Sequence, residues 1–163
     1  MVNSDGSGSP QQISHNVQLQ GAGYETEDCY LRWSPDGMKI AFTGLTAEIP
    51  GANRYNVYSM NSADGSNVTQ LTNCQINNPS FPSVCSTPSW SPDGSKIAFS
   101  DGNALYGDNI GGAGIYIMDP NGANITPLFQ DNNAISVFPH WSTEGKKIIF
   151  SYDLTCPRFL VQS

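Results

Sequence analysis

A tryptophan-centred motif occurs three times along this chain, and this internal repeat constrains the fold more than any other feature. The copies are LRWSPDGMKIAFTG at 31–44, PSWSPDGSKIAFSDG at 88–102 and a less closely matched PHWSTEGKKIIFSYD at 139–153. A repeat of this length indicates that one supersecondary unit recurs, and that neighbouring units bury a core between them. The chain is therefore expected to be an array of similar units rather than a single irregular domain.

Each copy of the motif predicts a β-hairpin. In the first copy, Pro35 pre-sets the backbone of a turn, and Gly37 supplies the positive φ that ends it. The residues that follow alternate in polarity, so Ile40 and Phe42 share one buried face of a strand. The other two copies repeat this pattern, which predicts three equivalent hairpins.

A second motif lies between the tryptophan motifs and predicts a second hairpin in each repeat. It occurs as MNSADGSNVTQLT at 60–72, as MDPNGANITPLF at 118–129, and in part as DGSGSPQQIS at 5–14. Two hairpins per repeat make a four-stranded antiparallel unit. The patterns place strands near 29–34, 38–43, 55–60, 67–72, 86–91, 95–100, 114–118, 125–129, 137–142, 146–151 and 157–162, with almost no helix.

The combination WSPDGxKIAF followed by IYxMDxxGxNxTxL resembles the TolB-like, WD-type β-propeller repeat. The resemblance covers nearly the whole chain. It implies an all-β fold, a β-propeller of four-stranded antiparallel blades with three blades per chain. It does not select a function, because such propellers serve as scaffolds, as caps on enzymes and occasionally as lyases.

The repeat phase predicts how the blades are divided along 1–163, which we treat as a single half-propeller. The segments are an outer strand at 1–16 that closes another blade, whole blades at 29–73 and 86–130, and an incomplete blade at 137–163. Propellers use about four to eight blades, so three are too few to close a ring. Two chains give six, and we expect a homodimeric six-bladed ring. The alternative is that the chain is a fragment of a longer propeller.

The cysteines predict disulfides and an oxidising compartment. Cys74 and Cys85 bracket an insert between two blades, and we expect them to be joined. Cys29 and Cys156 would adjoin each other across the two chains of a ring. No pair has zinc-site spacing. An even cysteine count and few lysines favour a periplasmic or extracellular protein, although the N-terminus has no signal-peptide pattern. Four free thiols in a reducing cytosol are the alternative.

Charge and hydropathy exclude two classes of partner. The formal net charge is −7, and the seven Lys and Arg residues are too few to follow a phosphate backbone, so we expect no nucleic-acid partner. No run of 18 apolar residues occurs, so we expect no membrane span.

Arg32, Ser89 and His140 precede the three repeat tryptophans, and we expect them to share one orientation toward the central channel. Some members of the wider propeller group, the oligogalacturonate lyases, hold a metal with channel histidines. This chain has only His15 and His140, so we expect His140 to be a hydrogen-bonded strand residue, with no bound metal and no cofactor.

No nucleophile motif, phosphate-binding loop or HExxH metal motif is present in the sequence, and we predict no catalytic residue. The predicted function is a non-enzymatic binding scaffold that dimerises and presents its loops or channel mouth to a protein or glycan. The alternative is a metal-dependent polysaccharide lyase or hydrolase that uses channel residues.

Overall fold

The computed structural model describes residues 4–5, 7–9, 13, 30–46, 54–74, 83–101, 114–131 and 135–153, and these residues form strands and turns without helix. This confirms the all-β prediction for the described part of the chain; the strand expected at 157–162 lies outside it. The strands are β1 (Arg32–Trp33), β2 (Lys39–Thr46), β3 (Arg54–Asn61), β4 (Thr69–Gln70), β5 (Ser83–Trp90), β6 (Ile97–Asp101), β7 (Gly114–Met118), β8 (Thr126–Gln130), β9 (Ile135–Trp141) and β10 (Ile148–Asp153).

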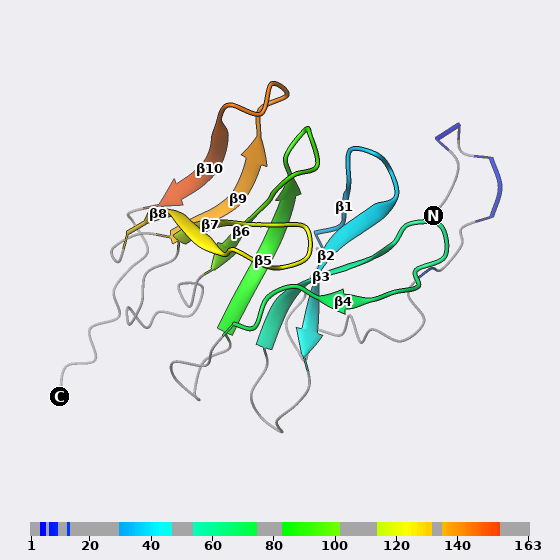
Figure 1. Ribbon diagram of the computed structural model, residues 1–163, viewed down its shortest axis with the longest axis horizontal. Coiled ribbons are helices and arrows are strands. Elements are labelled where there is room, and N and C mark those ends of the chain that lie inside the picture. The colour runs from blue at the N-terminus through cyan, green and yellow to red at the C-terminus, as the bar shows by residue number, and fades with distance from the viewer. Residues whose placement is uncertain are drawn as a thin grey trace.

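The strands form three antiparallel units that lie side by side (Figure 1). Strands β1 to β4 pair in sequence order to make the first unit, here called blade 1, and β5 to β8 make blade 2 in the same way. Strands β9 and β10 form the hairpin of blade 3. A short parallel pairing of β3 with β5 connects the first two blades. The predicted four-stranded antiparallel unit is thus present twice, followed by the start of a third.

Turn chemistry fixes the hairpin tips in the way the sequence predicts. Gly37, Gly94 and Gly145 have φ values of 71°, 72° and 70°, which an L side chain rarely adopts. In blade 2 the Asp93 carboxylate accepts hydrogen bonds from the Ser91 hydroxyl at 2.6 Å and the Ser95 backbone N–H at 3.0 Å. These bonds, the Ser91 bond first, lower the pKa of Asp93 to about 2 because they stabilise its charged form. Asp93 is therefore a turn cap, as is Asp36 in blade 1, whose carboxylate accepts from the Ser34 hydroxyl and the Met38 N–H.

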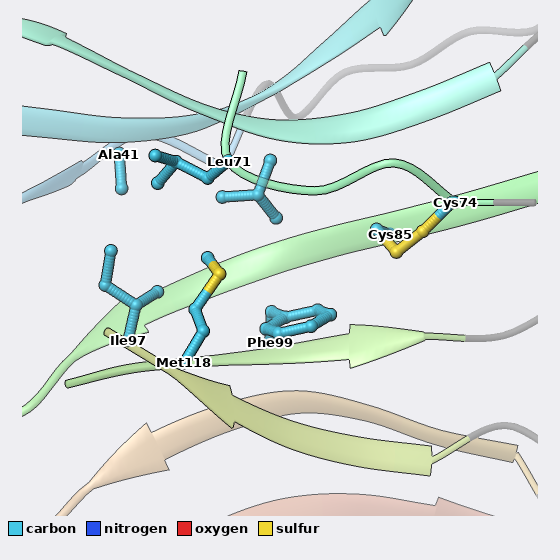
Figure 2. Close-up of a cluster of buried hydrophobic side chains, with 8 residues drawn as sticks. Ala41, Leu71, Cys74, Cys85, Ile97, Phe99 and Met118 are labelled. Carbon is cyan, nitrogen blue, oxygen red and sulfur yellow. A yellow bond between two sulfur atoms is a disulfide. The ribbon is translucent and has the colours of Figure 1, made fainter. Parts of the chain in front are cut away.

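The main hydrophobic core lies between blades 1 and 2 (Figure 2). Side chains alternate along β2, so Ala41 faces blade 2 while Ile40 and Phe42 face the opposite way. From blade 2, Ile97 and Phe99 face blade 1, and both are almost fully buried. The full cluster consists of Ala41, Val57, Leu71, Cys74, Cys85, Ile97, Phe99 and Met118.

A second cluster occupies the other face of blade 1. It contains Ile40, Phe42 and Met60, with Tyr58 and Ile13 packed against it. The Phe42 and Tyr58 rings are stacked with their centroids 5.7 Å apart, and the equivalent rings Phe99 and Tyr116 of blade 2 stack in the same way. Each blade thus has one face directed toward the preceding position in the array and one face directed toward the following position. We call these the incoming face and the outgoing face.

No helix in the described part of the chain is long and apolar enough to cross a membrane.

Candidate functional site

The three residues predicted to face the channel occupy equivalent positions on the first strand of each blade, β1, β5 and β9, here called the inner strands. Arg32 pairs with Ala41, Ser89 with Ala98 and His140 with Ile149. Directly opposed residues of an antiparallel pair project from the same face, so all three project from the outgoing face of their blade.

Their surroundings differ. Arg32 is half-buried, and its Nη1 donates to the Leu31 carbonyl oxygen at 2.9 Å. Ser89 is buried, whereas His140 is exposed. Whether these residues reach a central channel stays a prediction. His140 lies opposite the exposed Ile149 on the outgoing face of blade 3.

A backbone feature that sequence analysis missed precedes these residues in all three blades. Tyr30, Thr87 and Phe138, each two positions earlier, have φ values of 40°, 54° and 58°. This region is unfavourable for side chains that bear a Cβ, most of all for β-branched threonine. No local signal announces it, because a proline follows Thr87 and Phe138, and a residue before proline is biased toward negative φ.

Tertiary hydrogen bonds hold the strained backbone at Thr87. Its N–H donates to Thr43 Oγ1 at 3.2 Å, and its hydroxyl lies 2.6 Å from Ser100 Oγ. The pairing of β5 with β6 is irregular here, between Ser86 and Ser89. Such outliers persist only where surrounding structure over-determines them, and they cluster at binding and catalytic sites. The repeated outlier therefore marks the inner strands as the place to seek function.

The same three positions bring together an aromatic pair. The rings of Tyr30, two residues before β1, and of Phe138, on β9, have centroids 5.5 Å apart at an interplanar angle of 55°. Phe138 remains 43% exposed, and the exposed His140 lies two residues further along β9. An open aromatic surface beside an imidazole can stack on an apolar or sugar ring and donate a hydrogen bond.

A group of potential metal ligands lies elsewhere, at the junction of blades 1 and 2. One ligand atom from each of Cys74, Cys85 and Asp101 lies within 4.8 Å of the others. The two cysteines, however, are joined in a disulfide, with Cα atoms 5.9 Å apart, so neither offers a thiolate. This bond is the one predicted from the insert. His15, Cys29 and Cys156 lie outside the described residues.

Asp101 is held beside this disulfide in a largely apolar setting. Its Oδ1 lies 3.9 Å from Cys74 Sγ, and burial raises the pKa of its carboxyl group because the charged form loses hydration. A disulfide sulfur has no proton to donate. The contact therefore favours the protonated carboxyl group and makes a poor cation site.

This arrangement of blades is similar to that of known protein structures. Neither the protein-family models nor the curated proteins give a match. Among solved structures, a putative TolB from Agrobacterium tumefaciens superposes on 76% of this chain with a TM-score of 0.55 and 27% identity. TolB from Acinetobacter baumannii superposes on 74% with a TM-score of 0.52 and 22% identity. The fold is a TolB-like β-propeller.

The TolB-like fold is shared with proteins of other kinds. The AtxE2 isopeptidase superposes on 69% of the chain with a TM-score of 0.50 and 16% identity, which is a likeness of fold alone. The chain spans 38% of the length of the Agrobacterium protein and 25% of that of the Acinetobacter protein. The resemblance therefore establishes the blade architecture, and function has to be argued from the residues above.

Proposed function

We propose that this chain is a non-enzymatic binding module: a TolB-like half-propeller that dimerises and presents its inner-strand surface to a protein or glycan partner. The observation that carries the binding role is the aromatic contact between Tyr30 and Phe138, in which the Phe138 ring remains 43% exposed. Aromatic side chains contribute large contact areas with little loss of conformational entropy, and they are enriched where proteins bind partners.

The disulfide between Cys74 and Cys85 supports a periplasmic or extracellular location for this function. Disulfides form and persist in oxidising compartments and are rare in the cytosol. The net charge of −7 favours a partner that is not itself strongly acidic.

The binding role is tested with Phe138→Ala and Tyr30→Ala, assayed by calorimetry against a panel of neutral oligosaccharides and extended peptides. We expect a member of the panel to bind the wild-type protein and each substitution to weaken that binding by about tenfold or more, the effect of losing one good contact. The exposed turn residue Met38, replaced by alanine, is the control and should leave binding unchanged. Equal affinities for all four proteins would exclude this surface as the binding site.

Metal analysis of the purified protein separates the binding module from a metal-dependent lyase or hydrolase. A stoichiometric transition metal that survives dialysis and is lost in His140→Ala would overturn the non-enzymatic proposal. Protein without such a metal, combined with binding that depends on Phe138, is the outcome we expect.

A further inference from the structure

The junction between blades 1 and 2 repeats, in part, at the far side of blade 1. At the junction, the Leu71 carbonyl oxygen approaches Gly122 so closely that a Cβ there would lie 2.5 Å from it. On the incoming face of blade 1, the Ile13 carbonyl oxygen meets Gly65, the equivalent glycine, in the same way. Ile13 therefore occupies against blade 1 the position that Leu71 occupies against blade 2.

The described N-terminal residues also reproduce the outer hairpin turn. The Ser7 N–H donates to Asp5 Oδ1 at 2.8 Å, as the Ser66 N–H does to Asp64 Oδ1 at 3.0 Å. Gly8 has a φ of 83°, and Asn67, at the equivalent position, also lies in the left-handed region, with a φ of 54°. This segment lies at the blade 1 end of the molecule, away from β9 and β10 (Figure 1). It is the outer edge of a blade that would precede blade 1.

Among the described residues, nothing occupies the place where the inner strands of that preceding blade would lie against blade 1. In the WSPDG turns, Pro35 lies 3.8 Å from the Cβ position of Gly94, and Pro92 lies 3.6 Å from that of Gly145. No described residue comes within 4 Å of the corresponding position of Gly37. Trp33 is 53% exposed, whereas Trp90, its equivalent in blade 2, packs against the main core.

The outgoing face of blade 3 is also exposed, at the position of Ile149. Ala41 and Ala98, which occupy this position in blades 1 and 2, are fully buried, whereas Ile149 is 71% exposed. An apolar side chain so exposed, at a position where its equivalents are covered, indicates a surface that another blade covers.

We propose that a second copy of this chain supplies the missing strands: its blade 3 covers the incoming face of blade 1, where Ile13 already holds the outer position. The second copy's Ile149 then packs toward Ile40 and Phe42, as Ala41 does toward Ile97 and Phe99. Thr143, the equivalent of Pro35 and Pro92, meets Gly37. The seam is a composite blade made by two chains, and a two-fold axis forms it twice without a free end.

This inference deepens the dimerisation part of the proposed function by identifying its surface. A second copy is the expected occupant because the seam would repeat the interface between blades 1 and 2. In that interface Leu71 and Ala41 of blade 1 cover blade 2, and their equivalents at the seam are Ile13 of one copy and Ile149 of the other. Blades of a longer polypeptide could fill the same space, and the test distinguishes them.

The test compares Ile149→Asp with Met38→Asp by light scattering. Both residues are apolar and similarly exposed, at 71% and 69%, but Met38 lies on a turn tip where the other blades have Ser95 and Lys146. We expect wild type and Met38→Asp to have twice the chain mass of 17.6 kDa. A buried, unpaired carboxylate at each seam should weaken association by roughly 100-fold per seam, leaving Ile149→Asp monomeric or unfolded.

A cysteine pair keeps the proposal testable if Ile149→Asp fails to fold. Met38→Cys, at the residue next to Gly37, combined with Thr143→Cys should be joined between chains by a short bismaleimide, whereas each single variant, which keeps the native cysteines, should not. A dimer that survives Ile149→Asp and gives no such cross-link would overturn this seam but not dimerisation. A stable folded wild-type monomer would overturn both, and ligand binding by that monomer would leave the binding role standing.

Discussion

Removal of the disulfide between blades 1 and 2 should cost the protein a substantial part of its stability. Cys74 and Cys85 are 11 residues apart in the sequence, and the loop-entropy relation for a loop of that size gives about 2.8 kcal/mol. Both residues are buried in the main core, at 5% and 3% exposure, so replacing each with alanine also leaves a small cavity. The double variant should therefore unfold with a free energy about 3 kcal/mol below that of the wild type.

Urea unfolding at a fixed protein concentration measures this effect. With an m-value of about 2 kcal/mol per molar, the midpoint should fall by about 1.5 M. Reductant should shift the wild-type midpoint in the same direction, and by more than it shifts the double alanine variant. If the oxidised wild type and the variant unfold at the same urea concentration, core packing alone orders this connection and the entropic argument is refuted.

Three further predictions concern single residues. Burial raises the pKa of Asp101, so its charged form lowers the stability of the fold at neutral pH. Asp101→Asn should therefore have a higher melting temperature than wild type at pH 7. Thermal melts should show this difference vanish as the pH falls toward 3.8, the ordinary pKa of an aspartate. For Asp93 the pH dependence of stability has the opposite sign, because its pKa is lowered. Its carboxylate stabilises the fold above pH 3.8, and this contribution is lost as the pH falls toward about 2. Titration by NMR should give Asp93 a pKa near 2, and the pKa should rise in Ser91→Ala. Asn67 has a φ of 54°, a left-handed conformation that strains a β-branched side chain. Asn67→Val should therefore lower the free energy of unfolding by about 1–2 kcal/mol, whereas Asn67→Gly should be tolerated. Equal melting temperatures for these two variants would show that the backbone at this position is not strained.

The repeat in the sequence was sufficient to predict the hairpins and their buried faces. Turn geometry depends on a few adjacent residues, which is why Pro35, Asp36 and Gly37 specify their turn without help from the rest of the chain. Strand alternation has a fixed period of two, so the burial of Ile40 and Phe42 also follows from local pattern. The insert between Cys74 and Cys85 was enough to predict their pairing, because the residues lie close together in sequence.

The candidate site could not be predicted in the same way. Sequence analysis selected Arg32, Ser89 and His140 from their equivalent places beside the tryptophans, but it did not find the pair formed by Tyr30 and Phe138. These two residues are separated by a whole blade, and their contact depends on how three inner strands converge. The left-handed backbone that places them runs against local preference, and at Thr87 it is held by hydrogen bonds to Thr43 and Ser100.

Local chemistry thus determined the repeated unit, whereas the packing of one unit on the next decided what each equivalent position does. Ala41, Ala98 and Ile149 occupy the same place in the repeat, yet the first two are fully buried and the third is 71% exposed. Asp101 is charged in isolation, but burial beside a disulfide shifts it toward its neutral form. Burial and long-range contact are properties of the assembled blades, and the order of residues along one blade does not contain them.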